Sequence, residues 1–137
     1  MLDFAIHACD LSQPTRKFET LRQWTYLLFD EFFAQGDVEK ESGHAASFLC
    51  DRLNTTVCKE QPGFCNYIVM PTWRLLTTIM PGMSPCLDKV QQNIVSWERH
   101  TETEEEKRIY KPKPKRVSVN LLKKAITSRE GSLLELD

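Results

Sequence analysis

Few side chains in this sequence are suited to metal binding or nucleophilic chemistry, and their spacing matches no compact ligand motif. Three histidines and five cysteines occur in 137 residues, without a Cys-x-x-Cys pair. Cys58 and Cys65 would form a zinc site only with two further ligands, and neither His44 nor His100 has a helpful spacing. In a reducing compartment such scattered cysteines are typically small buried hydrophobes. The five are Cys9, Cys50, Cys58, Cys65 and Cys86.

A glutamine and a phenylalanine have a spacing that suits ligand binding. Gln61 and Phe64 lie three residues apart, so they share a face if this segment is helical. A side-chain amide both donates and accepts hydrogen bonds, and it can converge with the ring on one ligand. By spacing alone, the simpler interpretation is a glutamine near a helix start and a phenylalanine in the core.

The composition is that of an ordinary globular protein. Hydrophobic residues make up 41% of the chain and charged residues 27%, with a formal net charge of −1. This balance argues against a general nucleic-acid or membrane role. No run approaches the roughly 20 apolar residues of a membrane span. The first residues also lack the pattern of a cleaved signal peptide. We therefore expect at most one domain, in the cytoplasm.

The strongest helical pattern covers residues 16–35. Its apolar positions recur every three or four residues, and Leu27 and Phe29 widen the apolar surface beyond one stripe. Thr15 is the predicted N-cap and Gly36 the predicted C-cap. A helix this apolar normally packs inside a larger helical body. The stripe consists of Phe18, Leu21, Trp24, Leu28 and Phe32.

The other segments are also helical or irregular. Pro71 predicts a kink or a break in the second long helix. There is no internal repeat and no useful strand-like alternation, so the sequence predicts an all-α fold. The remaining expected elements are the end of a buried helix over 1–10, a polar loop or short helix over 37–47, a helix over 62–80, a turn over 81–85 and a helix over 86–98, whose apolar positions are Leu87, Val90, Ile94 and Trp97.

The composition changes near the C-terminus. Residues 107–124 contain eight Lys or Arg and no acid. Residues 111–115 alternate Lys and Pro and should be extended, whereas residues 120–128 have the pattern of a short amphipathic helix. Such a composition is typical of a tail or docking arm that is not part of a core. The expected division is a helical domain over 1–99 and a charged, Lys/Pro-rich tail or docking arm over 100–137.

Several motifs in register resemble one enzyme family over about residues 1–97. The segment from His7 to Pro14 is similar to that family's H-x-x-D-[IL]-S-x-P motif. The order and spacing resemble the C-terminal third of the catalytic domain of class I 3′,5′-cyclic-nucleotide phosphodiesterases. The further matching motifs are Arg22-Gln23-Trp24, Glu31-Phe32-Phe33, Gln35-Gly36-Asp37, Cys50-Asp51-Arg52 and the run Gln61-Pro62-Gly63-Phe64-Cys65-Asn66-Tyr67-Ile68-Val69.

The resemblance implies roles for six residues. Asp10 matches the last of the metal-binding aspartates. Gln61 matches the glutamine that reads the purine edge, and Phe64 matches the aromatic residue that stacks on the base. An alternative for Asp10 is a carboxylate that caps the turn at Pro14. The other positions, which line the nucleotide pocket in the family, are Gln13, Thr25 and Leu28.

The family's metal chemistry depends on residues that this chain does not contain. In the family, zinc and magnesium lie at the base of the pocket, held by histidines and aspartates, and another histidine protonates the leaving 3′ oxygen. Two such metals lower the pKa of water and neutralise charge on the phosphoryl group. These histidines precede the segment that resembles this chain. Asp10 alone cannot hold a metal pair, so we expect the isolated chain to bind no metal and to be inactive.

Two functions from different classes remain open. The chain is either one piece of a working phosphodiesterase in signal transduction, acting on cAMP or cGMP, or a truncated, non-catalytic relative in a ciliary or cytoskeletal assembly. In both cases we expect protein partners on the apolar N-terminal helices and on the basic arm of residues 107–124. Cyclic-nucleotide binding without hydrolysis is a third, weaker candidate, because its affinity would rest on base contacts alone.

Overall fold

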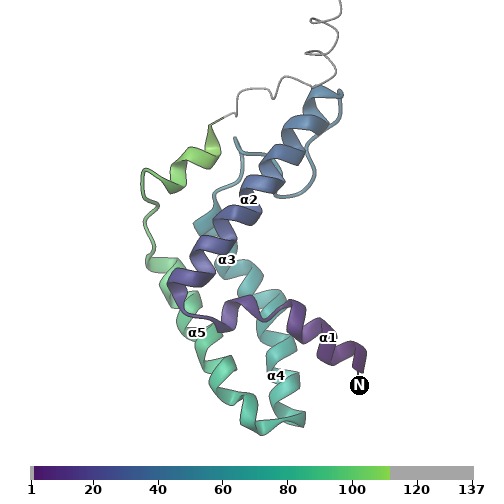
Figure 1. The fold of residues 1–137 in the computed structure, drawn as a ribbon, viewed down its shortest axis with the longest axis vertical. Coiled ribbons are helices and arrows are strands. Elements are labelled where there is room, and N and C mark those ends of the chain that lie inside the picture. Colours follow the sequence, from purple (N-terminus) through teal and green to yellow (C-terminus); the bar gives the residue numbers. More distant parts are fainter. Residues whose placement is uncertain (1, 112–137) are drawn as a thin grey trace, which may run out of the picture.

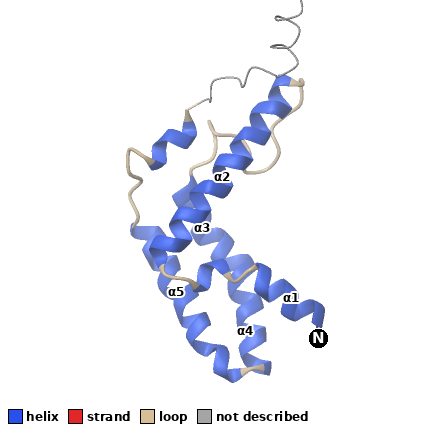
Figure 2. Cartoon of the chain, viewed as in Figure 1, coloured by secondary structure: helices blue, strands red, loops and turns tan. Residues whose placement is uncertain are grey.

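The computed structural model describes residues 2–111, and all regular structure in that part of the chain is helical, which confirms the predicted fold class. Figure 2 shows the helices and the loops between them. The α-helices are α1 (Leu2–Asp10), α2 (Phe18–Glu41), α3 (Val57–Phe64), α4 (Met70–Ile79) and α5 (Ser84–Arg99). The shorter elements are the 3-10 helices η1 (Gln13–Thr15), η3 (Pro81–Met83) and η4 (Glu106–Tyr110), and the π-helical segment η2 (Cys65–Val69). The predictions for residues 112–137 lie outside the described residues.

The helices form an elongated arrangement around one continuous rod (Figure 1). This rod consists of α3, η2 and α4, which follow one another without a break. Helix α5 returns alongside the rod and contacts both α3 and α4. Helix α2 packs against α3, and α1 packs against α4. None of the helices in the described part is long and apolar enough to cross a bilayer.

Two apolar clusters hold these helices together. Helix α5 contributes to both clusters, with Val90 and Ile94 in the first and Trp97 in the second. The predicted apolar stripe of α5 is therefore confirmed. The other buried members of the first cluster are Ala8, Cys65, Val69, Met70, Trp73 and Leu76. Those of the second are Leu21, Tyr26, Phe29, Phe33 and Val57.

The rod remains helical through Pro71, where the sequence predicts a kink or a break. The Met70 N–H donates to the Cys65 carbonyl five residues earlier, which is the bond of a π turn. Pro71 then stands in the first turn of α4, where a missing N–H matters least. The π-helical segment before Pro71 therefore lets the rod continue without the predicted break. The rod also begins at Val57 and not at the predicted residue 62.

Helix α2 ends later than predicted because Gly36 has a different role. Gly36 is buried inside the helix, and a Cβ atom there would lie 1.9 Å from the Cys50 carbonyl oxygen. Its small size permits close packing, and it does not cap the helix. Gly43, with φ of +82°, takes the left-handed conformation beyond the helix end. Thr15 lies in η1 and donates to the Ser12 carbonyl, so the predicted N-cap is also wrong.

The predicted buried faces of α1 and α2 are partly wrong. Trp24 and Leu28 belong to the predicted stripe, yet they are 58% and 43% exposed. In α1, Ala8 is buried but Ile6 is exposed. Helix α2 has apolar residues on more than one face, and spacing does not reveal which face is covered. The residues that α2 does bury are Leu21, Thr25, Tyr26, Phe29, Phe33 and Gly36.

The cysteines are less uniformly buried than predicted. Cys50 and Cys65 are buried, but Cys9 is exposed and the other two are half-buried. Burial raises the pKa of the Cys65 thiol to about 12. Cys65 therefore stays protonated and acts as a small core residue.

The segment of residues 101–111, which we call the strap, folds back onto α2. Ile109 and Tyr110 pack against the second apolar cluster, and Glu106 is buried. A Glu106 oxygen accepts a hydrogen bond from Arg22 at 2.5 Å, and the other lies 3.2 Å from His100 Nε2. The expectation that the chain beyond residue 99 is not part of the core is wrong for these strap residues.

Replacing Gly36 should be far more damaging than replacing Gly63. Nothing lies within 4 Å of a Cβ built on Gly63, so Gly63→Ala should be neutral or stabilise α3 by about 0.5–1 kcal/mol. Gly36→Ala should cost about 3 kcal/mol, because backbone must move to admit the methyl group. Urea unfolding followed by circular dichroism measures both variants. Equal stabilities would rule out the close approach of α2 to Cys50.

The buried carboxylate of Glu106 should make stability fall in acid. Burial acts to raise its pKa, but hydrogen bonds from Thr103 and Arg22 outweigh it and hold the pKa below the ordinary 4.5. Its contribution is therefore complete above pH 4.5 and is lost as pH falls through the lowered pKa. Glu106→Gln should flatten this part of the curve of unfolding free energy against pH. The exposed Glu105→Gln is the control, and identical curves for both variants would contradict the prediction.

Candidate functional site

The turn after α1 is held in place by side chains from two other helices. The indole N–H of Trp73 in α4 donates to the Leu11 carbonyl at 3.1 Å. The amide of Asn93 in α5 donates to the carbonyls of Pro14 and Arg16 at 2.7 and 2.8 Å. Trp73 and Asn93 are both buried, so these bonds lie away from competing water. The turn between α1 and α2 is therefore fixed relative to the core.

Two of the predicted site residues flank this turn and share an open cleft. Asp10 ends α1 with an exposed carboxylate, and Gln13 begins η1. The cleft has a volume of about 470 Å³. It combines a carboxylate, a guanidinium, an amide and an indole, a set that suits a charged ligand with a ring. The lining residues are Asp10, Ser12, Gln13, Arg16, Thr20 and Trp24.

The described residues supply only part of a divalent-metal site. No group of three or more His, Cys, Asp or Glu side chains gathers anywhere in residues 2–111. Protein zinc sites use three or four side-chain donors. Asp10 fits as one oxygen donor, but these residues alone do not fit a complete zinc or magnesium site.

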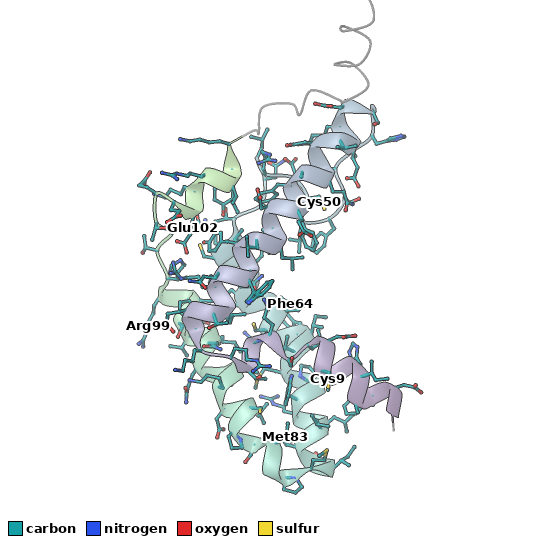
Figure 3. All side chains as sticks on the ribbon, viewed as in Figure 1. Cys9, Cys50, Phe64, Met83, Arg99 and Glu102 are labelled. Atoms are coloured by element: carbon teal, nitrogen blue, oxygen red, sulfur yellow. The ribbon has the colours of Figure 1, made fainter. Side chains whose placement is uncertain are left out.

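The other predicted ligand-binding residues are not among those that line this cleft. Gln61 is buried within α3, whereas Phe64 at the end of the same helix is 39% exposed. Figure 3 shows Phe64 near the middle of the molecule. Thr25 is buried in α2 and Leu28 is partly exposed on it. The structure thus brings Asp10 and Gln13 together and does not bring these four residues into the lining of their cleft. The assigned roles stay predictions.

Two of the sequence motifs interlock in the structure. Arg52 binds the Asp37 carboxylate with two parallel hydrogen bonds, Nε to Oδ1 at 3.0 Å and Nη2 to Oδ2 at 2.5 Å. The Arg52 guanidinium also lies 5.4 Å from the centre of the Phe33 ring. Next to this pair, Gly36 admits the Cys50 carbonyl. These motif residues therefore fasten the segment before α3 onto α2.

Sequence reasoning did not identify Arg16, Thr20 and Trp24 as residues of the cleft. A signal existed for two of them, because positions four apart lie above one another on a helix. Thr20 and Trp24 lie one turn apart on α2, whereas Arg16 precedes the helix in an extended conformation. Because Trp24 was assigned to the predicted apolar stripe, its spacing from Thr20 was not interpreted as part of a binding site.

A large apolar surface is uncovered on α2 and on the rod. Its members on α2 are exposed by 43–58%, and Tyr67 in η2 is 82% exposed. Exposed apolar side chains of this size and number are typical of an interaction site. The exposed side chains on these elements are Trp24, Leu27, Leu28, Phe64, Tyr67 and Ile68.

Comparisons with known proteins identify the family. The family model for 3′5′-cyclic nucleotide phosphodiesterase matches residues 1–90. The chain is 42% identical over 94 residues to 3′,5′-cyclic-AMP phosphodiesterase, isoform F, of Drosophila melanogaster. It is 42% identical over 96 residues to the probable 3′,5′-cyclic-AMP phosphodiesterase pde-4 of Caenorhabditis elegans. Each alignment covers 68% of this chain and 14% of the relative.

A solved structure supports the same conclusion. The structure of LmjPDEB1 in complex with IBMX matches with a TM-score of 0.62 and 34% sequence identity. The match covers 66% of this chain and 28% of that chain. The chain belongs to the 3′,5′-cyclic-nucleotide phosphodiesterase family, a family that uses divalent metals, and it corresponds to part of the helical catalytic domain. The resemblance found in the sequence motifs is confirmed.

Phe64 should contribute much less to stability than a core phenylalanine. Phe33 is fully buried, and Phe33→Ala should cost about 3–5 kcal/mol. Phe64→Ala should cost less than about 1.5 kcal/mol, because much of that ring already contacts solvent. Unfolding in urea measures both variants. A loss at Phe64 as large as that at Phe33 would make Phe64 a core residue and remove the reason to assign it to ligand binding.

Proposed function

We propose that this chain supplies the C-terminal part of a cyclic-AMP phosphodiesterase catalytic domain. The main observation that supports this proposal is the position of Asp10. It lies within the segment that matches the family, and its exposed carboxylate stands at a turn fixed by the core. The matched relatives are described as cyclic-AMP phosphodiesterases, which favours cAMP as the nucleotide.

Asp10, Gln61 and Phe64 have distinct roles in this proposal. Asp10 is one oxygen ligand of the family's metals, which activate water and neutralise charge on the phosphate. Gln61 hydrogen-bonds the purine edge, which its amide can do as donor and acceptor. Phe64 offers an exposed ring face on which the base stacks. Gln61 and Phe64 lie within one turn of each other on α3, so their side chains can reach the same base.

The chain by itself is proposed to be inactive. The described residues contribute Asp10 to the metal site, whereas the family's other metal ligands and its proton-donating histidine come from residues that precede the matched segment. Because such residues act as a unit, an incomplete set retains little of the rate.

The uncovered apolar surface is the proposed contact with the remainder of the catalytic domain. The match covers 28% of the LmjPDEB1 chain, so most of that chain is not aligned with this one. Covering a large apolar side chain contributes about 1.5–3 kcal/mol. Several such side chains on α2 and η2, among them Trp24, Leu27 and Tyr67, suffice to hold a separate segment.

Complementation tests the proposal. The purified chain should not hydrolyse cAMP when zinc and magnesium are supplied. Adding the separately produced part of the Drosophila relative that precedes its matched segment should restore hydrolysis. Asp10→Asn should then lower the restored rate by about a thousandfold or more, as expected for loss of a metal ligand. Asp3→Asn, an exposed acid in the first turn of the same helix, is the control and should change little.

Each result of this assay bears on the proposal. Turnover by the chain alone would contradict its inactivity. Restored turnover that is insensitive to Asp10→Asn would contradict the role of Asp10. Binding of the added segment without any turnover would contradict the catalytic function and favour the second candidate.

The second candidate is a non-catalytic component of a larger assembly. The observation that favours it is the strong exposure of Phe48 and Leu53, at 87% and 79%, in the connection between α2 and α3. These side chains would serve as contacts for another protein chain. The basic arm of residues 107–124 lies mostly outside the described residues, so its role as a docking arm and a ciliary or cytoskeletal location stay predictions.

A further inference from the structure

The strap follows the segment matched by the family model, and it binds the start of α3. Within it, one oxygen of Glu102 accepts two hydrogen bonds, from Tyr26 at 2.9 Å and from Tyr110 at 2.5 Å. The family model ends at residue 90, so these strap contacts belong to a part of the chain that the model does not cover. The Glu102 carboxylate thus links Tyr26 of α2 to Tyr110 of the strap.

Tyr110 also accepts a hydrogen bond from the first residue of α3. The Val57 N–H donates to the Tyr110 hydroxyl oxygen at 2.9 Å, across 53 residues of sequence. The first N–H groups of a helix have no partner within the helix. The N-cap residue Thr56 supplies none from its side chain, and Val57 is fully buried. The Tyr110 hydroxyl therefore caps α3 in place of a local side chain.

The hydroxyl of Tyr110 is fixed in orientation by its two partners. Burial, followed by the hydrogen bond to Glu102, raises the pKa of Tyr110 well above its ordinary value. The hydroxyl thus stays protonated and donates to Glu102, and a lone pair is directed at Val57. The ring packs on Phe33 with the centroids 5.6 Å apart, which holds the tyrosine against α2.

We propose that Tyr110, oriented by Glu102, is a positioning residue that sets the start of α3 and thereby the placement of Gln61 and Phe64. Gln61 follows Val57 by one helical turn, and Phe64 follows it by two. A shift of the first turn displaces both side chains together. The capping role stands on the contacts alone, whereas the effect on the purine base rests on the proposed function.

Hydrogen exchange on the full 137-residue chain tests the capping role. Tyr110→Phe keeps the ring and removes the hydroxyl, so exchange protection of the Val57 amide should fall by about tenfold, the effect of losing one buried hydrogen bond. Amides in the middle of α5 should be unaffected. Tyr67→Phe, at an exposed tyrosine, is the matched control and should change neither region. Unchanged protection of Val57 would overturn the proposal, as would an equal loss in α3 and α5.

A second variant separates Tyr110 from the rest of the strap. Tyr26→Phe removes the other hydrogen bond to Glu102 but leaves the Tyr110 contact with Val57 intact. It should lower protection of Val57 by less than Tyr110→Phe does. A larger loss in Tyr26→Phe would indicate that strap attachment as a whole matters and would count against Tyr110 as the positioning residue.

The complemented enzyme tests the effect on nucleotide binding. Tyr110→Phe should raise KM for cAMP by about fivefold and leave kcat within about twofold, because base contacts act on ground state and transition state alike. A lower kcat at unchanged KM indicates only less folded enzyme and would overturn the positioning role. If the unmodified chain gives no turnover after complementation, the proposed function fails, and the exchange experiment still decides whether Tyr110 caps α3.

Discussion

The buried guanidinium of Arg52 is the interaction on which the arrangement of the described chain depends. It pairs with Asp37 of α2, lies over the Phe33 ring, and donates to the backbone carbonyls of Ile109 and Lys111 in the strap. A charge that is 95% removed from solvent is costly unless it is paired and hydrogen-bonded, and here each of the three guanidinium nitrogens donates at least one hydrogen bond. One side chain thus joins α2, the segment before α3 and the strap. The purine-binding residues proposed on α3 depend on all three.

The functional proposal follows from helices that are covered on one side only. Helix α2 buries Phe29 and Phe33 yet exposes Trp24 and Leu27. The turn bearing Asp10 is fixed by Trp73 and Asn93. In the described residues, Asp10 belongs to no group of three or more side chains that could hold a metal ion. A fixed carboxylate beside exposed apolar side chains is the arrangement that we propose for one part of a larger catalytic domain. The chain spans only 14% of the length of each of the two relatives compared above, in agreement with this interpretation.

The sequence predicted what depends on local pattern and missed what depends on distant contacts. The α5 stripe of Val90, Ile94 and Trp97 has one apolar face, so spacing identified it correctly. Gly36 was misassigned as a helix end because its reason, the Cys50 carbonyl, lies in another segment. The strap has the composition of a tail, but Glu102 and Glu106 find partners 76 and 84 residues earlier. At the site, the order of the motifs identified Asp10 and Gln13, which do line one cleft. No local signal in the sequence indicates that Gln61 is buried.

Acrylamide quenching of Trp24 fluorescence tests most directly whether the uncovered surface receives the rest of a catalytic domain. Trp24 is 58% exposed, whereas Trp73 and Trp97 are almost fully buried, so the difference between the unmodified chain and Trp24→Phe isolates the signal of Trp24. Trp24 should be readily quenched in the chain alone and protected once the preceding catalytic segment of the Drosophila relative is bound. Quenching of Trp24 that stays unchanged in the bound complex would contradict this.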